Sequence, residues 1–181
     1  MAPVPDDRSQ RVFFALWPDA SLRTTLAELA REVARQSRGR PTEPNRIHLT
    51  LAFLGDQPAT RVEALRRLGG GIRARAFTLA LDALGGFPRS GIAWLGASAL
   101  QPDLEALQGE LATALRTGGF AVDERPYAPH LTLARQTASR IERRLREPLD
   151  WSVTSFFLVA SELGRGGPSY RTLAEWPLAA A

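Results

Sequence analysis

Apolar positions along the first half of the chain follow a strand pattern, then a helix pattern, and then both again. The run RVFFALW is rich in aromatic and β-branched residues, which is typical of a buried strand. Pro18 and Asp19 supply helix start signals, and leucines then recur on one helical face until Gly39 ends the pattern. We expect a strand, a long helix, a strand and a short helix over residues 11–17, 18–39, 47–54 and 59–68.

The second half repeats this order of elements. Pro102 and Asp103 open a leucine-rich helix that ends at Gly118. The expected elements are a strand, a long helix, a strand and a short helix over residues 91–97, 102–118, 130–133 and 138–146. Further strands are expected over residues 77–84, 151–163 and 170–176. The glycine-rich segment 164–169 favours a hairpin loop over a phosphate cradle, because no helix follows it.

The sequence has two histidines, and both begin the same tetrapeptide, His-Leu-Thr-Leu. His48 begins the first copy and His130 the second. Duplication explains how such a repeat arises, but not why this tetrapeptide survived while the surrounding sequence diverged. A repeat of this length predicts two similar lobes related by an approximate two-fold axis. The two tetrapeptides are therefore the strongest indication of a site.

Alternation of side chains along a strand places the histidine and threonine of each motif on one face. His48 and Thr50 share a face, as do His130 and Thr132. The opposite, core-facing set is expected to be Ile47, Leu49, Leu51, Phe53, Leu131 and Leu133. Ala52 and Ala134 should continue the polar face and leave room for a ligand. An approximate two-fold axis would set the two imidazole–hydroxyl pairs opposite each other across one cleft.

Composition excludes several kinds of chemistry. The 181 residues include no cysteine, which removes disulfides, thiolate nucleophiles and zinc sites built on sulfur. All 23 basic residues are arginine, so Schiff bases and lysyl-nucleotide intermediates are also excluded. An arginine-only composition is typical of a GC-rich genome, and guanidinium groups also match phosphate oxygens. The net charge of +4 mildly favours a polyanionic partner.

Two opposed imidazoles suit acid–base catalysis better than the other uses of histidine. Two histidines are too few for a zinc site, and the carboxylates show no ligand spacing around them, so no metal or other cofactor is expected. A Ser-His-Asp triad uses one histidine rather than a symmetric pair. With an ordinary pKa near 6.5, one imidazole can be neutral and the other protonated around pH 6 to 7. The threonine hydroxyls could then donate hydrogen bonds to non-bridging oxygens.

The paired His-x-Thr-x motifs resemble the signature of the 2H phosphoesterase superfamily. Five segments look like its bacterial and archaeal RNA 2′,3′-cyclic phosphodiesterase branch, first described as a 2′–5′ RNA ligase: FFALWPD, RIHLTLAFLGD, GGFPRSGIAWLG, APHLTLAR and GPSYRTLAEWPL. The resemblance covers nearly the whole chain. It implies an α+β, bilobal 2H phosphoesterase fold, with two pseudo-symmetric lobes whose antiparallel sheets surround a central cleft, as a single domain over residues 1–181.

The same resemblance implies metal-free hydrolysis of RNA 2′,3′-cyclic phosphate termini to 2′-phosphomonoesters, together with ATP-independent 2′–5′ ligation. It implies that His48 acts as general acid on the leaving 3′ oxygen and that His130 acts as general base on water. Thr50 and Thr132 would bind the phosphate. The family has a basic residue just after the second motif, and Arg135 matches it. Alternation places Arg135 on the core side, so a strand end or a β-bulge would be needed to turn it into the cleft.

The expected partners are RNAs with 2′,3′-cyclic phosphate ends, tRNA fragments among them, or small cyclic nucleotides. No apolar run approaches the roughly 18 residues of a membrane span, and the N-terminal segment has no secretion pattern, so we expect a cytoplasmic monomer. Two alternatives stay open. One is a nucleotide- or RNA-binding module that keeps the cleft without chemistry, and the other is a phosphodiesterase for another small cyclic phosphate. Intact histidines and threonines favour catalysis, because a binding module could lose an imidazole.

Overall fold

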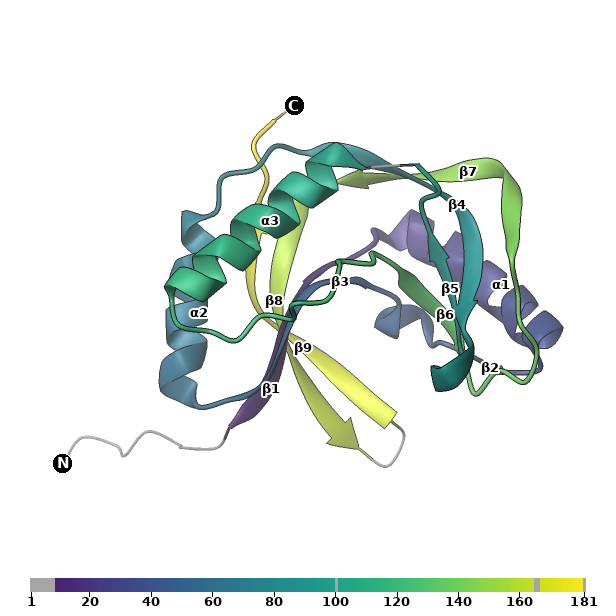
Figure 1. Ribbon diagram of the computed structural model, residues 1–181, viewed down its shortest axis with the longest axis horizontal. Helices are drawn as coiled ribbons and strands as arrows, with labels where there is room; N and C mark the ends of the chain where they lie inside the picture. The colour runs from purple at the N-terminus through teal and green to yellow at the C-terminus, as the bar shows by residue number, and fades with distance from the viewer. Residues whose placement is uncertain (1–8, 100, 165–166, 181) are drawn as a thin grey trace.

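Three α-helices pack against one antiparallel sheet in the computed structural model, which describes residues 9–99, 101–164 and 167–180 (Figure 1). The helices are α1 (Ala20–Ser37), α2 (Ala59–Gly71) and α3 (Pro102–Thr117), with short 3-10 helices η1 (Pro44–Arg46) and η2 (Pro88–Ser90). The strands are β1 (Gln10–Leu16), β2 (Arg40–Pro41), β3 (Leu49–Gln57), β4 (Phe77–Phe87), β5 (Ile92–Gly96), β6 (Leu131–Arg135), β7 (Arg143–Val153), β8 (Ser155–Gly164) and β9 (Gly167–Pro177).

The order of the strands divides the sheet into two half-sheets. Half-sheet A consists of β7, β4, β5 and β6, with β2 beside β6, and half-sheet B consists of β3, β1, β8 and β9. They join where Leu49 of β3 pairs with Leu131 of β6. Each of these leucines directly follows a motif histidine, so the junction brings the two motifs together.

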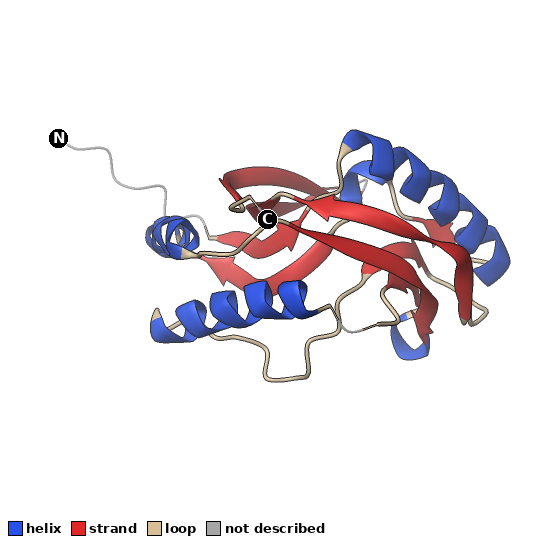
Figure 2. Cartoon of the chain, turned by 90° about the horizontal axis from the view of Figure 1, so that it is seen from above, coloured by secondary structure: helices blue, strands red, loops and turns tan. Residues whose placement is uncertain are grey.

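Each half of the sequence contributes to both half-sheets. Helix α1 follows β1 of half-sheet B but packs on β6, β5 and β2 of half-sheet A, whereas α3 packs on β3 and α2. Figure 2 shows the helices on both sides of the strands. The chain crosses back at Thr154, between β7 at one edge of the sheet and β8 in half-sheet B. The α+β fold was predicted correctly, but the lobes are not the two halves of the sequence.

The core contains the apolar positions that the sequence patterns indicated. Helix α1 is capped by Asp19, whose Oδ1 accepts a hydrogen bond from the Leu22 backbone N–H at 2.8 Å. Its buried face includes Leu26 and Val33, which are fully buried. The four leucines of α3 are buried to the same degree, at positions Leu104, Leu107, Leu111 and Leu115. Burial of these apolar side chains provides the main driving force for the fold.

The predicted helix over residues 138–146 is wrong. The backbone N–H groups of Ala138 and Ser139 donate to the carbonyl of Ser37 at the end of α1, at 2.9 and 3.0 Å. The following residues form β7, which pairs with β4 along most of its length. Tertiary pairing has overridden the helix propensity of the Glu, Arg and Leu residues in this segment. The single strand expected over residues 151–163 is likewise two strands, separated at Thr154.

Two glycine-rich segments also differ from the sequence-based expectation. Helix α2 continues through the glycines at 69–71 instead of ending before them. A Cβ at Gly69 would collide with the ring of Trp176, so the glycine permits β9 to pack closely on this helix. Strands β8 and β9 pair up to Gly164 and Gly167, which confirms a hairpin but shortens its loop. Residues 165 and 166 lie outside the described residues.

Candidate active site

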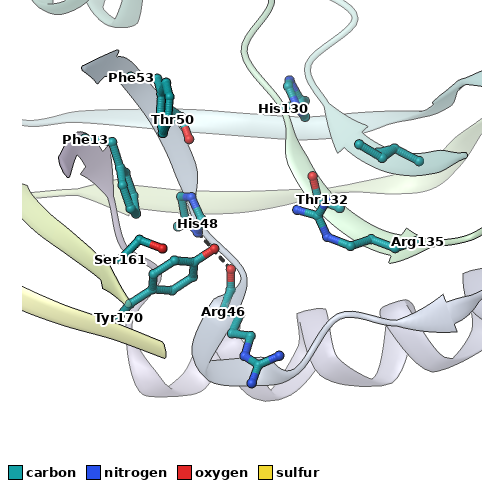
Figure 3. Close-up of a pocket in the computed structure, with 11 residues that line it drawn as sticks. Phe13, Arg46, His48, Thr50, Phe53, His130, Thr132, Arg135, Ser161 and Tyr170 are labelled. Atoms are coloured by element: carbon teal, nitrogen blue, oxygen red, sulfur yellow. Dashed lines mark hydrogen bonds between the residues drawn. The ribbon is translucent and has the colours of Figure 1, made fainter. Parts of the chain in front are cut away.

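One cavity of about 220 Å³ contains the polar side chains of both His-Leu-Thr-Leu motifs (Figure 3). Thr50 lies in β3 of half-sheet B and His48 directly precedes that strand, whereas Thr132 lies in β6 of half-sheet A and His130 directly precedes it. The structure therefore brings together all four residues that the motifs indicated. The lining residues are Phe13, Arg46, His48, Thr50, Phe53, Ile92, His130, Thr132, Arg135, Ser161 and Tyr170.

A β-bulge in β6 turns Arg135 into this cavity. Thr132 pairs with Trp94 of β5 and Ala134 pairs with Ala93, so Leu133 is an extra residue between them. Such a bulge breaks the strict alternation of faces. Leu133 and Ala134 are both fully buried, and Arg135 instead shares the cavity face with Thr132. The structure therefore contains the β-bulge that the sequence analysis required to turn Arg135 into the cleft.

Strand β3 contains the matching bulge at Leu51. Thr50 pairs with Ala15 of β1 and Ala52 pairs with Phe14. Ala52 is buried and Phe53, at 55% exposure, lines the cavity. The sequence-based assignments of Phe53 to the core and of Ala52 and Ala134 to the ligand face are therefore wrong, because alternation does not continue past either bulge.

The two bulges create pseudo-equivalent positions with different chemistry. Phe53 in β3 lies three residues after Thr50, and Arg135 in β6 lies three residues after Thr132. One side of the cleft thus presents an exposed aromatic ring and the other a guanidinium group (Figure 3). An aromatic ring can stack on a nucleobase, and a guanidinium group binds phosphate oxygens.

The backbone fixes both imidazoles in the same way. Nδ1 of His48 lies 2.8 Å from the carbonyl oxygen of Arg46, and Nδ1 of His130 lies 2.7 Å from that of Ala128. A carbonyl oxygen only accepts hydrogen bonds, so Nδ1 of each ring carries a hydrogen and donates it. Nε2 is then the nitrogen of each ring that can exchange a proton with a bound molecule. Both histidines have the geometry of an acid–base catalyst.

Their surroundings, in contrast, are unequal. The His48 ring is stacked on Trp17, with centroids 5.3 Å apart, and it also contacts Phe13 and the edge of Tyr170. The ring contact of His130 is an edge contact with Phe87, at 5.0 Å. The aromatic contacts shield part of the His48 ring from water, whereas His130 has fewer such neighbours.

Burial lowers the pKa of His48 to about 4, because an apolar environment disfavours the charged imidazolium. The hydrogen bond to the Arg46 carbonyl opposes this change, and the positive charges of Arg135 and His130 reinforce it. His48 is therefore neutral at pH 7.

Among the described residues that line the cavity, none is a carboxylate. Arg135 provides a guanidinium group whose charge reaches both His48 and Tyr170, and the charge of Arg46 reaches Tyr170. Burial raises the pKa of Tyr170, and the two arginines partly oppose that effect. An anion with several oxygen atoms, such as a phosphate ester, matches this lining.

A tyrosine from the segment before β6 holds the first motif in place. The Tyr127 hydroxyl donates a hydrogen bond to the backbone carbonyl of Thr50 at 3.0 Å. Tyr127 packs against the main core, and burial raises the pKa of its hydroxyl. The segment that leads to His130 is thereby connected directly to the start of β3, next to His48.

Sequence reasoning missed Phe13, Arg46, Ile92 and Ser161 as lining residues. Alternation backwards from His48 reaches Arg46, so this residue could have been found. Ser161 faces Tyr170 across the β8–β9 hairpin, a pairing that no local pattern indicates. The residues of the described ranges contain no cluster of three or more His, Cys, Asp or Glu side chains that could hold a metal ion. None of the described helices is long and apolar enough to cross a membrane.

Comparison with known proteins places this arrangement in a family. Residues 17–165 match the model of the 2′-5′ RNA ligase superfamily. The chain is 36% identical to the RNA 2′,3′-cyclic phosphodiesterase of Escherichia coli strain K12 over 172 residues, covering 93% of this chain and 97% of that protein. It is 35% identical to the enzyme of the same name from Thermus thermophilus, covering 93% and 90%.

Solved structures agree with these sequence matches. The crystal structure of E. coli LigT in complex with 3′-AMP superimposes with a TM-score of 0.85 at 35% identity, covering 94% of this chain and 98% of that one. The structure of TT0787 from T. thermophilus gives a TM-score of 0.78 at 29% identity, covering 93% and 97%. With the matched sequence, fold and motifs together, this chain belongs to the 2′-5′ RNA ligase superfamily.

Proposed function

We propose that this protein is a phosphodiesterase that hydrolyses 2′,3′-cyclic phosphate termini of RNA to 2′-phosphomonoesters. One observation supports this most strongly: two imidazoles with the same backbone-fixed tautomer share a cavity with two threonine hydroxyls and two arginines. A pair of positioned imidazoles can supply both proton transfers of a single displacement at phosphorus. Relatives with about 35% identity that carry the name RNA 2′,3′-cyclic phosphodiesterase support the same reaction.

In the proposed reaction, a water molecule attacks phosphorus while the bond to the 3′ oxygen breaks. His130 removes a proton from the water through Nε2, and His48 donates a proton from Nε2 to the departing 3′ oxygen. The product is a 2′-phosphate with a free 3′ hydroxyl. Each histidine ends in the protonation state from which the other began, so one proton exchange with solvent resets the site.

The proton on His48 must arrive with the substrate. Its pKa of about 4 leaves it neutral at pH 7 before an anion binds. A cyclic phosphodiester carries one negative charge, and an opposite charge close to an imidazole raises its pKa. We therefore propose that binding of the anion protonates His48. The reverse assignment, with His48 as base, has the lowered pKa in its favour, and the pH dependence of activity separates the two.

The non-bridging oxygens of the phosphate would lie against Thr50, Thr132 and Arg135. The two hydroxyls come from symmetry-related strands and line the cavity from opposite sides. Donors that are fixed before the reaction stabilise the charge that builds up on these oxygens in the transition state. The guanidinium of Arg135 adds a fixed positive charge, and the exposed ring of Phe53 provides a surface for the terminal base.

The same site accounts for ATP-independent 2′–5′ ligation. If the 5′ hydroxyl of a second RNA takes the place of water, the same bond to the 3′ oxygen breaks and a 2′–5′ phosphodiester forms. The energy comes from the strained cyclic phosphate, so no nucleotide cofactor and no lysine nucleophile are required.

We further propose a cytoplasmic monomer in which residues 1–181 act as one domain, with each lobe supplying one His-x-Thr strand. RNA ends are the proposed partner, with tRNA fragments and small cyclic nucleotides as substrates of the same chemistry. The absence of cysteine fits a reducing compartment. The cationic lining of the cavity supports an RNA terminus rather than a neutral ligand.

The deciding experiment uses a short RNA that ends in a 2′,3′-cyclic phosphate, in excess EDTA, with wild type, His48→Ala and His130→Ala proteins. We expect the wild type to form a terminus that resists an enzyme specific for 3′-phosphates, and both variants to form none. A requirement for added divalent metal would overturn the two-histidine mechanism. Tight binding of the RNA without turnover would instead identify a non-catalytic binding module. Turnover of another small cyclic phosphate but not of the RNA would assign that substrate class.

A further inference from the structure

A second arginine lies directly beside Arg135, outside the cavity. Strand β2 consists of two residues, and its Arg40 is the Cα partner of Arg135 in an antiparallel pair. Directly opposed residues of such a pair point to the same face, at a Cβ separation of about 5 Å. Since Arg135 lines the cavity, Arg40 extends its cationic face by one strand.

This pairing costs stability, which argues against a purely structural role. Like charges directly opposite each other in a sheet repel. Neither Arg40 nor Arg135 forms an ion pair with an acidic residue of the described ranges. An anion bound between the two guanidinium groups would turn this repulsion into attraction.

Two local features allow β2 to lie beside β6. A Cβ at Gly39 would come within 2.8 Å of the Arg135 carbonyl oxygen, so only glycine allows this approach of the two backbones. The backbone N–H of Thr42 then donates to the carbonyl of Leu133, the bulged residue, at 2.8 Å. Both contacts secure Arg40 next to the bulge that directs Arg135 into the cleft.

A third arginine precedes the strand on the opposite side of Arg135 from Arg40. On the other side of Arg135, Ile92 of β5 is its Cα partner. Helix η2, which precedes β5, includes the exposed Arg89, and the Thr137 N–H donates to the carbonyl of Gly91 at 3.1 Å. Arg40, Arg135 and Arg89 thus come from three neighbouring elements, and for none of them is an ion pair present within the described residues.

We propose that Arg40 binds the phosphate on the 5′ side of the terminal nucleotide while Arg135 binds the cyclic phosphate. The inference rests on the proposed function and narrows its substrate class. The substrate is a nucleotide or RNA chain with a phosphate 5′ to the terminal ribose, and nucleoside cyclic phosphates that lack it are inferior substrates.

Two substrates that differ only in that phosphate test the proposal: adenosine 2′,3′-cyclic phosphate and its 5′-phosphorylated form. In the wild type, we expect kcat/KM to be about tenfold higher for the phosphorylated compound, the scale of one charge-assisted hydrogen bond. Arg40→Gln should bring this ratio close to one, and Arg40→Glu below one. Arg116→Gln, at an exposed position at the end of α3, is the matched control and should keep the wild-type ratio.

A stability measurement separates binding from a structural role. Because Arg40→Gln removes one of two opposed charges, its thermal unfolding midpoint in phosphate-free buffer should be at least that of the wild type. An unchanged ratio together with a lowered midpoint would assign Arg40 to structure and overturn the proposal. Equal kcat/KM for both substrates in the wild type would also overturn it and leave the proposed function intact. Failure of the wild type to hydrolyse either compound would instead count against the proposed function itself.

Discussion

The imidazole of His48 lies stacked on the indole of Trp17, with centroids 5.3 Å apart and planes inclined by 15°. His130 has the edge of Phe87 as its ring contact. The two motifs share a sequence, a tautomer and a bulge, so this difference in surroundings is what distinguishes the two histidines. One displacement needs one acid and one base, and unequal environments are a general means of separating such roles.

Replacing Trp17 should identify the role of His48. In Trp17→Ala, water reaches the imidazole, so the pKa of His48 should rise from about 4 towards its ordinary 6.5. The pH profile of kcat/KM reports the ionisations of the free enzyme. If His48 is the acid, the limb of the profile in which kcat/KM falls with rising pH should move to higher pH by about one unit.

The same variant can contradict this assignment. If His48 is instead the base, the limb in which kcat/KM rises with pH should move and the falling limb should stay in place. Trp17→Phe keeps an aromatic ring against the imidazole and should retain most of the wild-type profile. Identical profiles for Trp17→Ala and wild type would show that the indole does not control the protonation of His48.

Stability should depend on pH through His48. Its pKa is about 4 in the folded protein and near 6.5 in the unfolded chain, so the unfolded chain binds the proton first as the pH falls. The contribution is complete above pH 6.5 and is lost as the pH falls towards 4. Between pH 7.5 and pH 5 the loss should be about 2 kcal/mol. Urea denaturation at both pH values measures it, with His48→Gln as the reference that lacks this ionisation. Equal losses in both proteins would contradict the prediction.

The sequence predicted the site residues because the motif histidines and threonines lie before each bulge. Strand alternation holds from His48 to Thr50 and from His130 to Thr132, and it fails at Leu51 and Leu133. A bulge depends on how a strand pairs with its neighbour, and that neighbour is distant in the sequence. The positions of Phe53 and Arg135 could therefore not be obtained from local pattern alone.

The wrong helix over residues 138–146 has a similar origin. Its helix-forming residues gave a local signal, but the alternate apolar positions Leu149, Trp151 and Val153 follow directly after it. This alternation of apolar and polar positions was the local indication of β7. Pairing with β4 then stabilises the strand over a helix. The lobes exchange helices for the same reason, since no local pattern states which half-sheet a helix covers.

Removal of the Tyr127 hydroxyl should impair catalysis more than binding. Tyr127→Phe keeps the buried ring but leaves the Thr50 carbonyl without this donor. We expect the free energy of unfolding to fall by about 1 kcal/mol, the usual contribution of one hydrogen bond. Because Thr50 lies at the start of β3, two residues after His48, kcat should fall while KM changes little. A lowered stability with unchanged kcat would limit Tyr127 to a structural role.

The two threonines should contribute through their hydroxyls and not through their shape. Valine has nearly the same volume as threonine but cannot donate a hydrogen bond. Thr50→Val and Thr132→Val should each lower kcat by about tenfold to a thousandfold, which is the range for the loss of one oxyanion donor. Serine at either position restores the hydroxyl and should recover much of the rate.

Single-turnover measurements with a cyclic-phosphate RNA separate the chemical step from product release. If the valine variants keep the wild-type rate and the serine variants are slow, the methyl group and not the hydroxyl carries the effect. If only one threonine matters, the pseudo-symmetry of the cleft does not extend to the transition state.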